Sequence, residues 1–261
     1  HAGPFFILYF FNIIILSNII EKLKKKNFDF IYFLSLLSFI FINIVFYRIS
    51  EHGTDRSSQI LLIIIFLLFF EILYSKEKNK NRLIWKKKRK ELFSLSSAED
   101  KESLLSFFAS IAGELKGKIV AGYNSFGGEV NCLELLKFSS LKGALIALPY
   151  VNSKKFIEFR EWEDGDDLEP DFYNIPSPKK SNVLIPDIIL IPLLCFDLNG
   201  MRLGMGEGIY DRSLPFFNLS DKFGLAFSGQ EVKYIQKEEH DFLIDGVITE
   251  KKVFIFKGKK S

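Results

Sequence analysis

The chain has 261 residues, enough for one large domain or for a smaller domain with an additional segment. It carries 35 lysines and arginines against 32 aspartates and glutamates, and this formal net charge of +3 is too small to predict a nucleic-acid partner. Two cysteines, Cys132 and Cys195, lie far apart without metal-type spacing. A reduced, intracellular compartment therefore fits these thiols better than a disulfide scaffold, and we expect a cytoplasmic location.

The first 82 residues are far more apolar than the rest of the chain. They contain three apolar runs, at 5–20, 28–47 and 60–74, and only the second has the roughly 20 residues that a membrane-spanning helix needs. Basic residues follow the first run and the third run. By the positive-inside tendency this places everything after residue 75 in the cytoplasm. We expect residues 1–82 to be a helical, hydrophobic region with these three runs as candidate transmembrane helices.

A second interpretation of residues 1–82 stays open. Ile, Phe, Leu, Lys, Asn and Tyr are the residues that AT-rich codons supply, so a non-native extension would have the same composition. In both interpretations the sequence predicts a boundary after residue 82, with a globular domain over residues 83–261.

The chain after residue 82 has the pattern of an α/β domain. It begins with two predicted helices, over 82–95 and 96–115, and Ser96 or Ser97 is the expected N-cap of the second. Short runs rich in Ile, Val, Leu and Phe then recur, as is typical of central strands covered on both faces. These runs are 118–123, 144–150, 187–192, 222–227 and 245–249.

A helix is predicted over residues 132–141, between the first two apolar runs. A strand, a helix and a second strand in this order form a β-α-β unit with parallel strands. We therefore expect residues 83–261 to form a three-layer α/β/α domain around a mostly parallel sheet. About 180 residues are enough for one buried core of this kind.

A cluster of four glycines follows the strand predicted over 187–192: Gly200, Gly204, Gly206 and Gly208. Glycine costs backbone entropy, so a cluster indicates positive φ angles or another group close to the backbone. A strand, a glycine-rich loop and a helix start together form an arrangement that binds phosphate through free N–H groups. A tight surface turn with ordinary ion pairs would need the same glycines, and the loop alone leaves both interpretations open.

Charged residues surround these glycines. Arg202 and Arg212 are spaced to reach phosphate oxygens, while Asp197 and Asp211 offer carboxylates of the kind that hold magnesium beside a phosphate. Glu207 lies among the glycines, where its carboxylate would repel phosphates unless it faces away or meets a cation.

The stretch PLLCFDLNGMRLGMGEGIYDR, from Pro192 to Arg212, resembles the signature of the 5-formyltetrahydrofolate cyclo-ligase family. The resemblance extends over residues 86–250, and it places Glu129 at the family's acidic position and Arg89 at its phosphate-binding arginine. The positions that match the signature are Pro192, Phe196, Asp197, Gly200, Arg202, Leu203, Gly204, Gly206, Gly208, Tyr210, Asp211 and Arg212.

The resemblance implies an enzyme that uses ATP and Mg²⁺ to convert 5-formyltetrahydrofolate into 5,10-methenyltetrahydrofolate, with release of ADP and phosphate. ATP phosphorylates the formyl oxygen, N10 attacks the activated carbon, and phosphate departs. Such chemistry needs positioning and charge neutralisation more than a side-chain nucleophile.

The resemblance also implies a role for individual residues. Arg202 and Tyr210 are the predicted catalytic residues, and Asp197 and Asp211 are the predicted magnesium ligands. The predicted ATP-binding residues are Lys86, Arg89, Arg202, Gly204, Gly206, Gly208, Tyr210 and Asp211. The predicted substrate-binding residues are Glu129, Phe126, Tyr150 and Tyr173.

Glu129 would hydrogen-bond to the pterin, and the aromatic rings, with Trp162 as a further candidate, would pack against the flat pterin and aminobenzoyl groups. Taken singly, each ring is equally well explained as an ordinary packing residue, and Glu129 as an acid at a helix start.

The expected partner is 5-formyltetrahydrofolate, with or without a polyglutamate tail, and the catalytic domain is expected to be a monomer. It would be cytoplasmic, either free or anchored to the membrane by residues 1–82. Four positions depart from the family pattern: Trp85, Leu193, Glu207 and Ile209. Two of them, Leu193 and Glu207, motivate one alternative. In that alternative the protein binds folate or nucleotide without catalysis and is tethered to the membrane.

Overall fold

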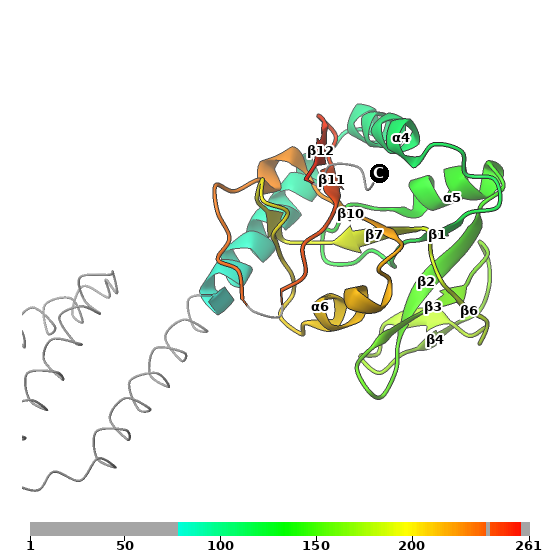
Figure 1. Ribbon diagram of the computed structural model, residues 1–261. Helices are drawn as coiled ribbons and strands as arrows, with labels where there is room; N and C mark the ends of the chain where they lie inside the picture. Colours follow the sequence, from blue (N-terminus) through cyan, green and yellow to red (C-terminus); the bar gives the residue numbers. More distant parts are fainter. Residues whose placement is uncertain (1–77, 239–240, 257–261) are drawn as a thin grey trace, which may run out of the picture. The chain divides into compact units, whose positions relative to one another are not determined.

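The computed structural model describes residues 78–238 and 241–256 (Figure 1). The three predicted membrane segments lie outside these residues. The chain divides into two compact units, and the described residues belong to the second unit, Lys76–Ser261. No helix within the described part is long and apolar enough to cross a bilayer.

Two helices open the described part, as predicted. The first covers residues 78–95 and runs through the boundary predicted after residue 82, and α4 follows over Ala98–Ala112. Ser97 is the N-cap of α4: its Oγ accepts a hydrogen bond from the Asp100 N–H at 3.1 Å, and the Asp100 carboxylate accepts one from the Ser97 N–H at 2.8 Å. This reciprocal pair satisfies two N–H groups at the helix start, so it separates the two helices at this point.

An eight-stranded sheet forms the centre of the domain, in the order β12-β11-β10-β7-β1-β2-β3-β6. Its five middle strands are parallel, and each coincides with one of the predicted apolar runs. The middle strands are β1 (Ile119–Ala121), β2 (Leu145–Val151), β7 (Ile188–Pro192), β10 (Asp221–Leu225) and β11 (Gly246–Ile248).

The remaining strands are short and antiparallel, and the sequence analysis does not predict them. β3 (Ile157–Glu161) and β6 (Val183–Leu184) extend the sheet beyond β2, and β12 (Val253–Ile255) pairs with β11 at the other edge. Two hairpins lie outside this sheet. They are β4 (Leu168–Pro170) with β5 (Pro176–Pro178), and β8 (Cys195–Phe196) with β9 (Arg202–Leu203).

Helices cover both faces of the sheet (Figure 1). α4 and α5 (Leu133–Leu141) lie on one face, and α6 (Ile209–Ser213) with the 3-10 turn η1 (Leu214–Phe216) lies on the other. Along β7 the side chains alternate, so that Ile188 and Leu190 join the core under α4 and α5 while Ile189 and Ile191 join the core near α6. The result is a mixed α/β fold with a large central sheet.

This topology brings distant loops to one edge of the sheet. Because β1, β7, β10 and β11 are parallel, the loops that follow them all leave from their carboxyl ends. In open α/β sheets ligands bind beyond those ends, so the loops after β1 and β7 are the place to look for a site.

Candidate functional site

The hairpin β8–β9 leads into the loop over residues 204–208, here called the glycine loop. Asp197 fixes the hairpin turn: it is fully buried, and its Oδ1 accepts hydrogen bonds from the N–H groups of Asn199 at 2.9 Å and Met201 at 3.1 Å. Its Oδ2 accepts a third bond from the Ile235 N–H at 2.9 Å. The carboxylate of Asp197 therefore holds the backbone together on both sides of the turn.

Arg202 connects β9 to α6 and to a segment near the end of the chain. Its buried guanidinium donates to Asp211 Oδ1 at 2.7 Å and to the Phe242 carbonyl at 2.6 Å. The same Oδ1 accepts a bond from the Phe242 N–H at 3.2 Å. These contacts are with protein groups, and the catalytic and ATP-binding roles of Arg202 stay predictions.

The two predicted magnesium ligands do not form a cation site. Asp197 is committed to backbone N–H groups, and Asp211 is paired with Arg202. In the described ranges no three His, Cys, Asp or Glu side chains are grouped so that they could hold a metal ion. A magnesium ion held by Asp197 and Asp211 does not fit this arrangement, and we assign no chemical step to it.

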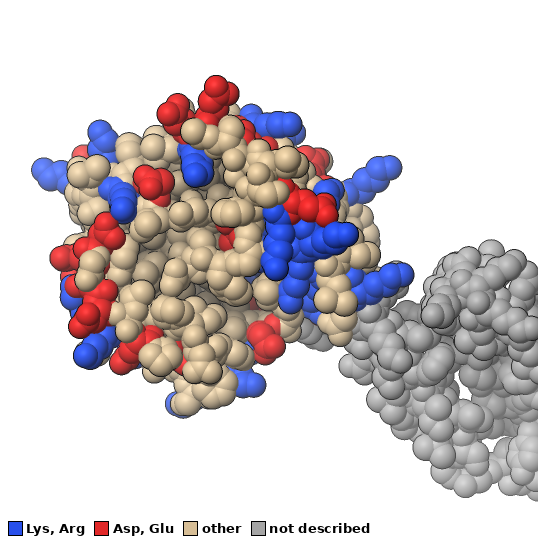
Figure 2. Space-filling view, turned by 180° about the vertical axis from the view of Figure 1, so that it is seen from behind, with Lys and Arg blue, Asp and Glu red and all other residues tan. Residues whose placement is uncertain are grey.

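A basic pocket of about 400 Å³ is lined by the helix over residues 78–95, the loop after β1 and the glycine loop. Lysines and arginines gather on one face of the molecule at the edge of a hollow (Figure 2). The pocket brings together the predicted ATP-binding residues Lys86 and Arg89. Its lining residues are Lys86, Lys87, Arg89, Lys90, Phe126, Gly127 and Met205.

Arg82 reaches the glycine loop from the same helix, and the sequence analysis missed it. Its Nε donates to the Gly204 carbonyl at 3.3 Å, and its guanidinium carbon lies 3.4 Å from the point where a Cβ on Gly206 would stand. The signal was present in the spacing, because residues 82, 86 and 89 recur at four and three along a helix and so share one face.

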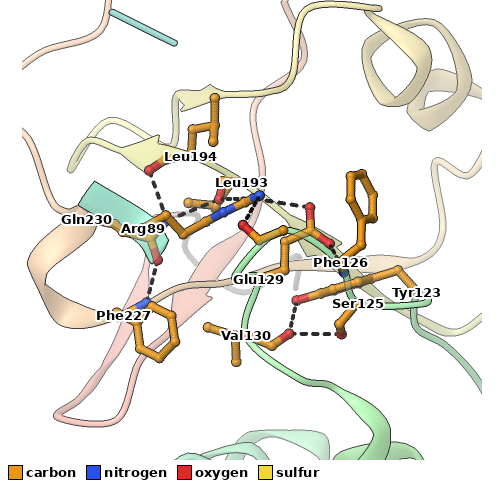
Figure 3. A network of polar contacts seen from close by, with 11 residues as sticks. Arg89, Tyr123, Ser125, Phe126, Glu129, Val130, Leu193, Leu194, Phe227 and Gln230 are labelled. Atoms are coloured by element: carbon orange, nitrogen blue, oxygen red, sulfur yellow. Dashed lines mark hydrogen bonds and ion pairs between the residues drawn. The ribbon is translucent and has the colours of Figure 1, made fainter. Parts of the chain in front are cut away.

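Arg89 is deeply buried for a charged side chain, with 2% of its surface exposed (Figure 3). Its Nη1 lies 3.1 Å from Glu129 Oε1 and donates to the Leu193 carbonyl at 3.4 Å. Its Nη2 donates to the Gly127 carbonyl at 3.2 Å. Arg89 thereby ties the helix to the loop after β1 and to the end of β7.

Glu129 faces Arg89 from the loop after β1. Its second oxygen, Oε2, accepts a hydrogen bond from the Phe126 N–H at 3.1 Å. Burial raises the pKa of the Glu129 carboxyl, while Arg89 and the Phe126 N–H oppose this shift. The charged form of Glu129 therefore depends on Arg89.

Gln230 supports the end of β7 from behind this pair (Figure 3). Its Nε2 donates to the carbonyls of Leu193 at 3.1 Å and Leu194 at 2.9 Å, and its Oε1 accepts from the Phe227 N–H at 2.7 Å. The Leu193 carbonyl thus receives bonds from both Gln230 and Arg89. This fixes Leu193 although a leucine here departs from the family pattern.

A second pocket of about 480 Å³ lies on the other side of the loop after β1. It shares Phe126 and Gly127 with the basic pocket, and Glu129 and Trp162 face it. The indole Nε1 of Trp162 is buried and has no hydrogen-bond partner among the described residues. The other lining residues are Phe93, Tyr123, Asn124, Ser125, Gly128, Asn131, Leu133, Leu136, Leu148, Asp164 and Leu168.

The predicted aromatic residues are distributed unevenly around this pocket. Phe126 and Trp162 line it, whereas Tyr150 and Tyr173 are not among its lining residues. The guanidinium of Arg160 stacks on the Tyr150 ring at 3.3 Å from its centre, and the Tyr173 hydroxyl donates to Glu207 Oε2 at 3.3 Å. The sequence analysis expects the Glu207 carboxylate to repel phosphates unless it faces away, and in the structure this carboxylate points toward Tyr173.

Tyr210, the second predicted catalytic residue, lies in the first turn of α6. Its pKa is raised strongly, first by burial and then by electrostatic interactions with Glu129 and Cys132, with Arg202 opposing. Its hydroxyl therefore keeps its proton throughout the neutral range, so it can donate a hydrogen bond but cannot act as an anionic nucleophile.

The fold and these contacts define a class of protein. A mixed α/β sheet carries, at the carboxyl ends of its parallel strands, a basic pocket beside a second pocket with a buried carboxylate and aromatic walls. This is the arrangement of an enzyme that brings an anionic ligand next to a flat, polar one.

Comparison with known proteins identifies the family. The sequence profile of the 5-formyltetrahydrofolate cyclo-ligase family matches residues 74–250, and the chain belongs to this family. The predicted family resemblance is thus confirmed.

Named relatives agree with this assignment. The chain is 29% identical to a 5-formyltetrahydrofolate cyclo-ligase of Haemophilus influenzae over 60% of this chain and 88% of that protein. It is 31% identical to the protein of the same name from Escherichia coli K12 over 52% and 79%, respectively.

Solved structures agree as well. The chain resembles the 5,10-methenyltetrahydrofolate synthetase of Aquifex aeolicus with a TM-score of 0.59 and 29% identity, over 70% of this chain and 95% of that one. A 5,10-methenyltetrahydrofolate synthetase from Mycoplasma pneumoniae matches with a TM-score of 0.52 and 25% identity, over 66% and 98%.

Replacing Arg89 with methionine should make stability depend on pH. Without the guanidinium, Glu129 is a buried, unpaired charge, and we expect a loss of about 3–5 kcal/mol near pH 7. Burial raises the folded-state pKa of Glu129 above its unfolded-state value, so the native state binds more protons than the unfolded state between these two pKa values. Stability therefore falls as pH rises from the unfolded-state pKa to the folded-state pKa. The loss should therefore be smaller near about pH 5, as urea unfolding at both pH values will measure.

The control for this pH effect is the double variant Arg89→Met with Glu129→Gln, which has no carboxyl to titrate. It should lose stability equally at both pH values. A pH-independent loss in the single variant would contradict the dependence of Glu129 on Arg89.

Replacing Arg202 with alanine should destabilise the fold. The change leaves Asp211 without its partner and the Phe242 carbonyl without its donor, and because Asp211 is partly exposed we expect about 2–3 kcal/mol. Arg212→Ala removes an exposed arginine that donates only to two backbone carbonyls, so it should cost less, about 1 kcal/mol. Equal free energies of unfolding for the two variants would show that the Arg202 pair is not structural.

Proposed function

We propose that this protein converts 5-formyltetrahydrofolate into 5,10-methenyltetrahydrofolate at the expense of ATP, with release of ADP and phosphate. The observation that carries the proposal is the pair of pockets that meet at Phe126 and Gly127, one basic and one with a buried carboxylate and aromatic walls. Phosphoryl transfer to the formyl oxygen requires both substrates within contact distance, which adjoining pockets allow.

The basic pocket is proposed as the site of the ATP phosphates. Lys86 supplies a positive charge inside it, and Arg82 contacts the glycine loop, whose Met205 lines the pocket. Backbone N–H groups of Gly204, Gly206 and Gly208 would complete the cradle. Fixed donors of this kind stabilise the charge that develops on a transferred phosphoryl group.

Four of the predicted ATP-binding residues have other roles in this proposal. Arg89 shapes the wall between the pockets through Glu129 and Gly127, and Arg202 and Asp211 hold α6 against the segment at Phe242. Tyr210 keeps its proton and is proposed to donate a hydrogen bond at the reaction centre.

The second pocket is proposed as the folate site. Glu129, kept charged by Arg89, can accept hydrogen bonds from the amino and N–H groups of a pterin. The unpartnered Nε1–H of Trp162 can donate to a carbonyl of the substrate, because a buried donor without a partner is costly until it is satisfied. Phe126 lines both pockets and would lie where the two substrates meet.

The wider context of the enzyme remains proposed. We propose a monomeric, cytoplasmic catalytic domain. We propose no preference between substrates with and without a polyglutamate tail. A membrane anchor would require residues 1–82, which lie largely outside the described part, and the relatives' names give no support for one.

The direct test is turnover by the purified full chain with 5-formyltetrahydrofolate, ATP and magnesium. The methenyl absorbance should rise, with one ADP and one phosphate released per product, and the rise should stop when ATP is left out. Binding of both substrates without product would favour the non-catalytic alternative.

Gly204→Ala should separate nucleotide binding from folding. Gly204 does not have a left-handed φ, and a Cβ on it would meet no described atom within 4 Å, so the protein itself does not require glycine there. If a phosphate approaches this backbone, the added methyl group will obstruct it, and the KM for ATP should rise about tenfold or more while thermal stability is unchanged.

Gly117→Ala provides the matched control. Gly117 has a φ of +76° and likewise no described atom within 4 Å of an added Cβ, but it lies between α4 and β1. This variant should lose about 1 kcal/mol of stability and keep the KM for ATP. An unchanged KM in Gly204→Ala would remove Gly204 from the nucleotide site.

A further inference from the structure

Besides Arg82, two side chains attach the glycine loop to the rest of the domain. The Tyr173 hydroxyl donates to Glu207 Oε2 at 3.3 Å. Arg212 donates from Nη1 to the Glu207 carbonyl at 2.8 Å and from Nη2 to the Lys155 carbonyl at 3.4 Å. Both contacts converge on Glu207, the one acidic residue of the loop.

The turn that carries Tyr173 is itself well fixed. Asp171 is buried, and its Oδ1 accepts hydrogen bonds from the N–H groups of Tyr173 at 2.8 Å and Ile175 at 2.9 Å. Its Oδ2 accepts a third from the Val151 N–H at 3.3 Å, at the end of β2. Tyr173 is therefore held on the sheet by its backbone, and its hydroxyl is a fixed point for the loop.

The loop has little else to hold it. Met205, Gly206 and Glu207 are exposed, and Gly206 has a φ of +116°. Glycines widen the range of backbone conformations, so a loop that contains three of them loses more entropy when a ligand orders it. Contacts that hold the loop before the ligand arrives reduce that loss.

We infer that Tyr173 is a positioning residue for the nucleotide site, whose hydroxyl holds Glu207 so that the glycine loop is ordered and the carboxylate faces away from the phosphates. This inference rests on the proposed function for the identity of the ligand. Partial burial and the nearby Glu207 raise the pKa of Tyr173, which keeps its hydroxyl a donor at neutral pH. Neither Tyr173 nor Glu207 is among the residues that line the basic pocket.

This role differs from the sequence-based prediction that the Tyr173 ring packs against the pterin. Tyr173→Phe distinguishes the two, because it removes the hydroxyl and keeps the ring. Loss of the hydroxyl alone should weaken nucleotide binding and leave the KM for 5-formyltetrahydrofolate and kcat unchanged. If the ring alone matters, neither KM should change, and a change in the KM for the folate alone would place the hydroxyl at the folate site; either result overturns the inference.

The decisive experiment is a double-mutant cycle with Tyr173→Phe and Glu207→Ala, read by calorimetric titration with magnesium and a non-hydrolysable ATP analogue. With Glu207 present, Tyr173→Phe should raise the Kd about threefold to tenfold, as expected for loss of one solvent-exposed hydrogen bond. In the Glu207→Ala background the same change should have no effect, because the hydroxyl has no acceptor to hold.

The outcomes separate this inference from the proposed function. An equal effect of Tyr173→Phe in both backgrounds, or no effect in either, overturns the inference while nucleotide binding by the unmodified protein still stands. Failure of the unmodified protein to bind the analogue overturns the inference and the proposed function together. Coupling in the titrations without turnover would support the inference and refute the cyclo-ligase activity.

Discussion

The site depends on one buried ion pair, between Arg89 and Glu129. Two charges removed from water are costly unless they are paired and further hydrogen-bonded, and both are: Arg89 through the carbonyls of Gly127 and Leu193, Glu129 through the Phe126 N–H. The pair joins three segments that are far apart in the chain. The pair also forms the wall between the basic pocket and the second pocket, so the separation of the two pockets depends on this pair.

The parts of this fold that sequence analysis predicts are those in which local pattern and burial agree. The five parallel strands are covered on both faces and therefore appear as continuous apolar runs, and Ser97 carries its own cap signal. The edge strands β6 and β12 have two and three residues and pair only with distant strands, so no local pattern marks them. Their existence is decided by tertiary pairing.

Prediction of the site is limited in the same way, because local sequence patterns do not show which groups the tertiary fold brings together. The family signature leads to the glycine loop, but it cannot distinguish an arginine that faces a ligand from one that holds the fold, and Arg202 pairs with Asp211 and Phe242. Asp197 likewise has the residue type of a magnesium ligand and the contacts of a turn cap. Conversely, helical spacing groups Arg82 with Lys86 and Arg89 on one face, but it does not show that this face adjoins the glycine loop. The bond between Tyr173 and Glu207 likewise depends on which turn adjoins the loop, and the sequence pattern does not contain that information.

The central claim is that two substrates occupy two pockets on opposite sides of the loop after β1. Steady-state kinetics of Lys86→Ala and Trp162→Phe tests it most directly, because each side chain lines only one of the two pockets. Lys86→Ala should raise the KM for ATP about tenfold and leave that for 5-formyltetrahydrofolate unchanged, and Trp162→Phe should do the reverse with a smaller factor. If both variants change the KM of the same substrate, the two pockets do not divide the substrates and the account is wrong.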